Sequence, residues 1–165
     1  MWRRFVPGLF TDPGALLYVG AGAWQGGSTG LLALHKAGNE ITVLEAWRPE
    51  IDKLLAGPRG HCVRHAVCGD VREIENVPLP HPRYDHAVWS HGPEHLPKAD
   101  VAPVLASLEA LADRILISCP YGEMRQNAVR GNPHTAHKSA WYPEEFQDLG
   151  YHTAVWMKRE IVAWK

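Results

Sequence analysis

The sequence predicts an α/β protein built on a doubly wound, mostly parallel sheet with helices on both faces. Three observations predict this fold class. The apolar run over 15–19 ends abruptly in a glycine-rich turn, as a buried parallel strand does where it enters a helix. Apolar strands then alternate with helical segments over the first two thirds of the chain, which implies right-handed crossovers. Four residues lie at the carboxyl ends of predicted strands: Gly20, Glu45, Asp70 and Ser90.

The first half of the chain contains four expected strands and two expected helices. Gly38 supplies a stop signal for the first helix, and Pro49 suits the first turn of the second. The expected elements are strand 15–19, helix 27–36, strand 41–45, helix 49–56, strand 61–67 and strand 84–90.

The second half is expected to complete the sheet. Apolar residues recur at helical spacing over 97–112, and 114–118 is the strongest strand pattern in the chain. Residues 143–146 open a short helix with proline and two acidic residues in its first turn. Two last strands, over 151–156 and 160–164, are expected to form an antiparallel pair.

Length and composition fit a single domain over residues 1–165, with 1–14 as an N-terminal extension. The chain is 45% hydrophobic and 21% charged, with a formal net charge of −1. These values are ordinary for a soluble globular protein and give no electrostatic reason to expect nucleic acid. No stretch suits a membrane span or a signal peptide. The three cysteines have an odd count and no CxxC spacing, which argues against a disulfide framework or a zinc knuckle and favours the cytoplasm.

The glycine turn after the first strand predicts a nucleotide-type cofactor. Ligands of such sheets bind outside the carboxyl ends of the strands, and glycines let backbone amides approach a ligand closely. The dinucleotide pattern G-x-G-x-x-G fails, because Gln25 stands at the third glycine position. The phosphate loop G-x-x-x-x-G-K-[ST] also fails, because no lysine follows the glycines.

The order of motifs resembles that of class I S-adenosylmethionine-dependent methyltransferases, from Ala15 to the C-terminus. The resemblance implies a Rossmann-like, seven-stranded sheet with an antiparallel C-terminal strand pair. At two positions the chain departs from the family pattern: Tyr18 replaces an acidic residue, and Trp24 replaces the third glycine of G-x-G-x-G. The matching segments are Val19-Gly20-Ala21-Gly22, Glu45, Gly69-Asp70-Val71, 84–90 with Glu94-His95-Leu96, 117–122, and 132–134 with 141–146.

The resemblance implies S-adenosylmethionine as cofactor, with Glu45 on the ribose hydroxyls and Asp70 on the adenine amino group. A carboxylate can accept both ribose hydroxyls in a bidentate arrangement. Trp47 can either stack on the adenine or pack at the rim of the site. Trp24 and Tyr18 can either contact the sulfonium or have an ordinary packing role. The expected cofactor-binding residues are Tyr18, Gly20, Ala21, Gly22, Trp24, Glu45, Ala46, Trp47, Asp70, Val71 and Ser90.

The histidine clusters predict no metal site. His91-Gly92-Pro93-Glu94-His95 matches the H-x-x-E-H pattern of one metallopeptidase group. That pattern works only on a continuous helix, which Gly92-Pro93 disfavours. His134 and His137 have i, i+3 spacing, but the sequence shows no third ligand for them.

Three histidines are candidates for a general base. Oxygen and nitrogen acceptors must lose a proton during methyl transfer, and histidine titrates near neutral pH. His91 follows the fourth strand, where the acceptor should meet the methyl group. His134 and His137 lie in 123–140, an insertion expected on the acceptor side. We expect one of the three to be the base, with His91 first; alternatively, all three only bind or pack. His95 is expected to be structural.

The sequence thus predicts a methyltransferase that moves a methyl group from S-adenosylmethionine to an oxygen or nitrogen of a small-molecule acceptor by in-line displacement. A small metabolite or a sugar-like acceptor is preferred. Ser90-His91-Gly92-Pro93 stands where amino-methylating nucleic-acid enzymes carry Asn-Pro-Pro-Tyr, which disfavours DNA and RNA. The alternatives are a non-catalytic cofactor-binding or scaffold protein and an NAD-dependent oxidoreductase, against which Gln25 argues. The sequence does not indicate the oligomeric state.

Overall fold

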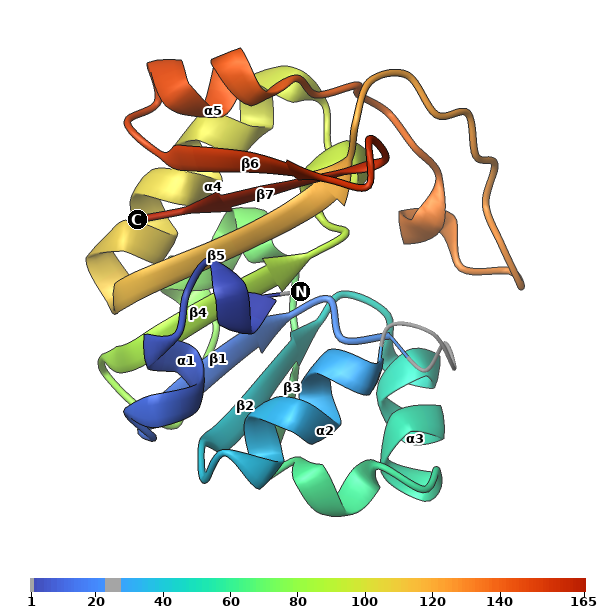
Figure 1. The fold of residues 1–165 in the computed structure, drawn as a ribbon. Coiled ribbons are helices and arrows are strands. Elements are labelled where there is room, and N and C mark those ends of the chain that lie inside the picture. Colours follow the sequence, from blue (N-terminus) through green and yellow to red (C-terminus); the bar gives the residue numbers. More distant parts are fainter. Residues whose placement is uncertain (1, 23–27) are drawn as a thin grey trace.

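The computed structural model describes residues 2–22 and 28–165, and its strands form one seven-stranded sheet (Figure 1). The strands are β1 Ala15–Val19, β2 Glu40–Glu45, β3 His65–Cys68, β4 Tyr84–Ser90, β5 Ala112–Pro120, β6 His152–Trp156 and β7 Glu160–Trp164. Their order is β3-β2-β1-β4-β5-β7-β6. β1 to β5 pair in parallel, and β7 pairs antiparallel with β5 and β6. The predicted fold class is confirmed.

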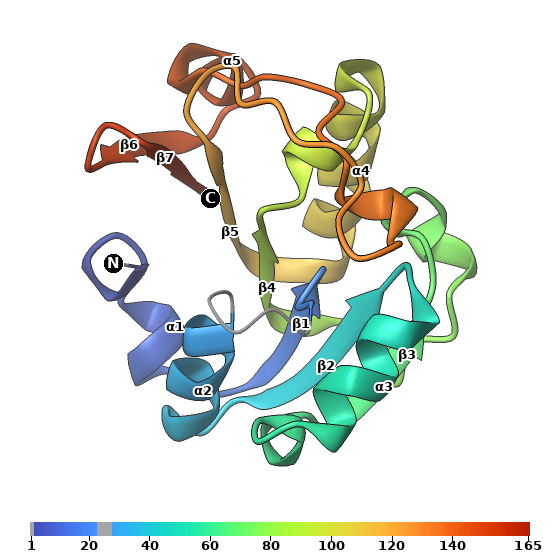
Figure 2. The same cartoon turned by 90° about the vertical axis from the view of Figure 1, so that its right-hand side faces the viewer.

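Helices cover both faces of this sheet (Figures 1 and 2). The helices are α1 Gly8–Thr11, α2 Ser28–Lys36, α3 Arg48–Ala56, α4 Lys98–Leu111 and α5 Pro143–Asp148. The described residues also contain five short 3₁₀ turns that the sequence did not predict: η1 Trp2–Arg4, η2 Gly60–Cys62, η3 Val71–Asn76, η4 Pro93–His95 and η5 Pro133–Thr135. In the part of the chain that the structure describes, no helix has the length and apolarity needed to cross a membrane.

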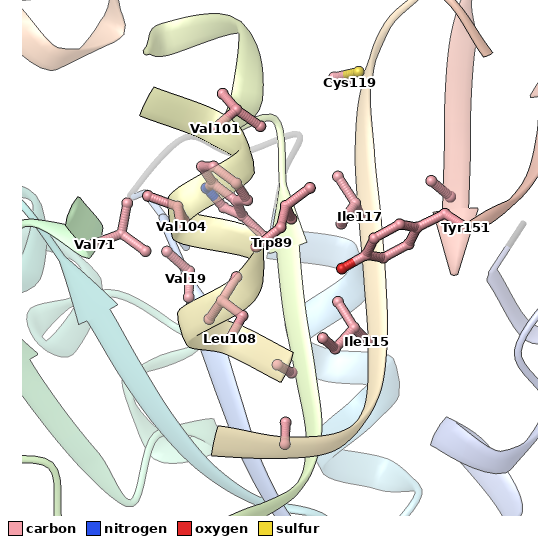
Figure 3. Packing of buried hydrophobic residues seen from close by; sticks show 14 of the residues in the cluster. Val19, Val71, Trp89, Val101, Val104, Leu108, Ile115, Ile117, Cys119 and Tyr151 are labelled. Carbon is pink, nitrogen blue, oxygen red and sulfur yellow. The ribbon is translucent and has the colours of Figure 1, made fainter. Parts of the chain in front are cut away.

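The two faces of the sheet bury two separate apolar clusters. Successive side chains of a strand point to opposite faces, so Leu17 of β1 packs in the cluster under α4, whereas Leu16 packs in the cluster under α1 and α2. Figure 3 shows the first cluster, where Val104 and Leu108 of α4 face Trp89 of β4. Each fully buried apolar side chain contributes about 1.5–3 kcal/mol to the stability of the fold. The packed clusters thereby hold the strand ends that carry the site in place.

The N-terminal segment is part of the core and not an appendage. Trp2, Val6 and Leu9 are buried in the cluster on the α1–α2 face. Phe5 stacks on Trp164 of β7, with 5.5 Å between ring centroids. The expectation of an extension over 1–14 therefore missed the cover of this face.

Two strands differ from their predicted bounds by two residues or more. Residues 60–62 form η2, because Cys62 N donates to Arg59 O and Val63 N donates to Gly60 O in tight turns. The third strand consequently begins at His65 instead of residue 61. β5 is longer than predicted at both ends, since it is hydrogen-bonded to β4 on one side and to β7 on the other.

The segment 123–140, which we call the strap, projects from the carboxyl edge of the sheet between β5 and α5 (orange in Figures 1 and 2). It contains η5 and is hydrogen-bonded to η4: Lys138 N donates to Glu94 O over 2.7 Å, and Ser139 Oγ donates to Pro93 O over 3.0 Å. The strap therefore closes over the edge at which the predicted site lies.

Candidate functional site

A cavity of about 720 Å³ lies at the carboxyl edge of the sheet, between the ends of β1 to β4 and the strap. This volume is within the usual range for a small-molecule or cofactor site. Gly20, Glu45, Asp70 and Ser90, predicted from four different strand ends, all line it. The fold therefore brings together the residues that the sequence placed at this edge.

The glycine turn leaves β1 with an unusual backbone conformation. Gly20 has φ +68° and Gly22 has φ +51°, both in the left-handed region that favours glycine. Gly20 N donates to Leu44 O over 2.8 Å, which fixes the turn against β2. Ala21 and Gly22 also line the cavity. Trp24 lies outside the described residues.

Glu45 is a buried carboxylate at the end of β2 that binds the glycine turn. Its Oε2 accepts from Gly22 N over 3.4 Å, and its Oε1 accepts from Trp47 N over 3.2 Å. Burial raises the pKa of Glu45, and these backbone hydrogen bonds oppose the shift. Each oxygen retains a lone pair, so the carboxylate can still accept two hydrogen bonds from a ligand.

Asp70 caps η3 at the end of β3. Its Oδ1 accepts from Arg72 N over 2.9 Å, and its Oδ2 lies 2.6 Å from Arg72 Nη2. These contacts with Arg72 lower the pKa of Asp70. Val71 is buried and lines the cavity beside it. Asp70 thus presents a stable negative charge at the predicted adenine end.

Tyr18, Ala46 and Trp47 differ in their relation to the cavity. Tyr18 and Ala46 line it. The Tyr18 ring is buried 6.3 Å from the Trp2 ring, and burial raises its pKa. Trp47 is not in the cavity lining; the ammonium of Lys53 lies 5.3 Å from its ring centroid.

The end of β4 carries Ser90 and His91 into the cavity. Ser90 Oγ lies 3.1 Å from Ser118 Oγ of β5. His91 has φ +52°, and its N–H donates to Ser118 O over 2.7 Å. Its Nδ1 lies 3.3 Å from Glu94 Oε1, and its Nε2 lies 3.8 Å from Glu160 Oε1. The hydrogen bond with Glu94 raises the pKa of His91.

Gly92 allows the η4 turn to pack directly on β4. A Cβ atom at Gly92 would overlap the indole of Trp89, so no larger residue fits there without a shift. This close packing buries Glu94, which is 3% exposed. The sequence had assigned Glu94 only to a motif, and the structure places its carboxylate within 4.0 Å of both His91 and His95 in the lining of the cavity.

The strap histidines occupy two different places. The centroid of the His137 ring lies 5.0 Å from that of the His95 ring. A ligand atom of each ring lies within 4.8 Å of a carboxylate oxygen of Glu94. His134 is exposed on η5 and lies close enough to Asp70 to lower its pKa. Burial lowers the pKa of His95. The three candidate bases are therefore not one cluster: His91 and His137 lie beside Glu94, and His134 lies on the cofactor side.

No protein-family model and no curated protein matches the sequence. Several solved structures are similar to it. TehB from Haemophilus influenzae has a TM-score of 0.67 and 12% identity, over 99% of this chain and 61% of that one. A SAM-dependent methyltransferase from Aquifex aeolicus has a TM-score of 0.65 and 13% identity, over 98% and 87%. An O-methyltransferase family protein from Burkholderia thailandensis has a TM-score of 0.66 and 12% identity, over 96% and 52%.

This chain thus spans just over half of the O-methyltransferase family protein and about three fifths of TehB. At these identities the likeness concerns the fold. The strand order, the antiparallel β7 and the cavity at the carboxyl edge agree with it. The predicted resemblance is confirmed at the level of structure: the chain has the fold of class I S-adenosylmethionine-dependent methyltransferases.

Proposed function

We propose that the chain binds S-adenosylmethionine at the carboxyl edge of the sheet and transfers its methyl group to an oxygen or nitrogen of a small-molecule acceptor. One observation carries the proposal. The buried carboxylate of Glu45 is hydrogen-bonded to Gly22 of the glycine turn and faces a cavity of about 720 Å³. A group of hydroxyls, such as a ribose diol, matches the acceptor capacity that Glu45 retains.

The other cofactor-side residues fit the same ligand. Asp70 supplies a stable negative charge for an amino group, and Ala46 and Val71 supply apolar contacts for a ring. Tyr18 is buried and lines the cavity, so a cofactor bound there would contact it. Ser90 ends β4, next to His91, and also lines the cavity.

S-adenosylmethionine supplies an electrophilic methyl group: the acceptor atom bonds to the methyl carbon as the carbon–sulfur bond breaks and S-adenosylhomocysteine leaves. The chain has to align the acceptor and receive its proton, and alignment carries much of the rate of such displacements. His91 is the first candidate for receiving the proton, on the basis of its position between β4 and the strap. Gln126 and Asn132 of the strap and Glu160 of β7 line the cavity and favour a hydroxylated, sugar-like acceptor.

Transfer from S-adenosylmethionine labelled in its methyl group tests the proposal. We expect labelled product from at least one acceptor in a panel of hydroxylated and amino metabolites, and a reduced yield from His91→Ala. Binding of the labelled compound without transfer to any acceptor supports the alternative of a non-catalytic cofactor-binding or scaffold protein.

A further inference from the structure

We propose that Glu94, His95 and His137 bind a divalent first-row transition-metal ion in the wall of the cavity, with coordination positions left open for an acceptor oxygen. Binding of the ion depends only on these residues. Its role toward the acceptor rests on the proposed methyl transfer.

The ligand atoms of the three residues already lie within 4.8 Å of one another. Glu94 Oε1 and His95 Nε2 are 4.0 Å apart. Two imidazoles and one carboxylate are a common donor set for such ions and leave positions open. In a loaded site with bonds of about 2.1 Å the donors stand roughly 3.4 Å apart, so closing onto an ion requires a shift on the order of 1 Å.

Both histidines are oriented as metal ligands usually are. His95 Nδ1 lies 3.2 Å from Ala136 O, and His137 Nδ1 lies 2.6 Å from Met124 O. Because a carbonyl oxygen only accepts, each Nδ1 must carry the hydrogen, and each neutral ring keeps its lone pair on Nε2. Metal-bound histidines typically donate their other ring N–H to a carbonyl or carboxylate in this way.

The Glu94 carboxylate has a buried oxygen that a cation could pair with. Its side chain is 3% exposed, and its Oε2 is buried without a hydrogen-bond partner among the described residues. A buried carboxylate oxygen without a partner is costly. His91 contacts only the other oxygen, Oε1. An ion held by Glu94 would satisfy the carboxylate.

Two other groups of ligand types in the described part of the chain lack these features. Their members are Glu40, His65 and His81 in one group and His35, His61 and Cys62 in the other. Glu40 is half-exposed and its Oε1 already contacts both of its histidines, and Cys62 Sγ contacts His61 Nε2. Glu94, His95 and His137 alone among the three groups line the cavity.

An ion at this position would favour one chemical class of methyl acceptor. A divalent ion lowers the pKa of a hydroxyl that it binds and fixes its oxygen. The hydroxyl proton passes to the base of the proposed methyl transfer, the oxygen bonds to the methyl carbon as the carbon–sulfur bond breaks, and the ion keeps its oxidation state. The site therefore favours an acceptor that bears a hydroxyl, preferably with a second oxygen that can chelate, and so an O-methylation.

Titration of the metal-free protein with Co²⁺, followed by visible absorption and calorimetry, tests the site. We expect one ion per chain to bind in this site and Glu94→Gln and His137→Ala each to weaken its binding at least about tenfold. His81→Ala and Cys62→Ser, which remove a ligand from the two other groups, should keep this binding. His137→Gln, in the exposed strap, provides a second variant if Glu94→Gln fails to fold.

Three results would overturn the site: no Co²⁺ bound to the wild-type protein, undiminished binding in both Glu94→Gln and His137→Ala, or loss of the ion in His81→Ala or Cys62→Ser. S-adenosylhomocysteine binding, measured on the same metal-free samples, separates this proposal from the preceding one. If S-adenosylhomocysteine binds but Co²⁺ does not, only the metal site is wrong. If Co²⁺ binds but S-adenosylhomocysteine does not, only the proposed cofactor binding is wrong.

Discussion

The cavity has two halves that are assembled in different ways. On the proposed cofactor side, Gly20, Glu45 and Asp70 stand at or within two residues of the end of their own strands, and nearby backbone N–H groups donate to both carboxylates. On the proposed acceptor side, Glu94 on η4 meets His137 on the strap, more than 40 residues later in the chain. One half is thus built from strand ends and the other from contacts between loops.

This difference predicts that the two halves can be damaged separately. The cofactor side depends on charges held by one sheet edge, so a single substitution there should affect ligand binding and leave the strap unchanged. The acceptor side depends on η4 packing against β4 and on the strap packing against η4. Changes there should weaken the binding of the acceptor and of the metal ion, while the cofactor still binds.

The largest expected effect concerns Glu45. Glu45→Gln removes the charge that accepts ligand hydroxyls, and hydrogen bonds to charged groups contribute about 1.5–3 kcal/mol each. We expect S-adenosylhomocysteine to bind roughly 10- to 100-fold more weakly, measured by calorimetry. Glu40→Gln, at the amino end of the same strand, is the matched control and should bind as the wild type does. Equal affinities of Glu45→Gln and wild type would remove Glu45 from the site.

The next effect concerns the support of the acceptor half. Gly92→Ala places a methyl group against the Trp89 indole, and such overpacking costs about 1–3 kcal/mol. We expect a lower Tm and weaker Co²⁺ binding, with S-adenosylhomocysteine affinity retained. Trp89→Phe alone should be destabilising, but the double variant should lose less than the sum of the two changes. Simple additivity would show that the overlap is not the cause.

The smallest expected effect concerns the pair of Asp70 and Arg72. Arg72 lowers the pKa of Asp70 in the folded state, so the pair contributes stability that is present above the ordinary Asp range and lost as pH falls through the lowered pKa. Because the pair is partly exposed, we expect Arg72→Ala to cost up to about 1 kcal/mol at neutral pH. The Tm difference from wild type should shrink toward about pH 3. A difference that grows on acidification would contradict this assignment.

The same contrast explains what the sequence could predict. Runs such as 15–19 and 84–90 carry their strand pattern locally, and the acids that follow strands share one edge by topology alone. The mostly parallel sheet, its antiparallel C-terminal strand pair and the lining positions of Gly20, Glu45 and Asp70 were therefore predictable. The N-terminal cover was not, because Trp2 and Val6 form no periodic element and are buried only by tertiary packing.

The group around Glu94 was also outside the reach of local patterns. The sequence showed His91 to His95 as a failed helical motif and His134 with His137 as a pair without a third ligand. The structure instead pairs His137 with His95 and Glu94, through hydrogen bonds from the strap to η4. Loop-to-loop contacts of this kind have no period that a sequence could display. The buried, unpartnered oxygen of Glu94 became visible only with the fold.

The most direct test of the central claim compares S-adenosylhomocysteine with NAD in thermal unfolding of the purified protein. A ligand at about 100 times its Kd adds about 2.7 kcal/mol, which for a chain of this size raises Tm by roughly 5–10 °C. We expect this shift with S-adenosylhomocysteine in the wild type, a much smaller one in Glu45→Gln, and none with NAD. Stabilisation by NAD alone would contradict the account.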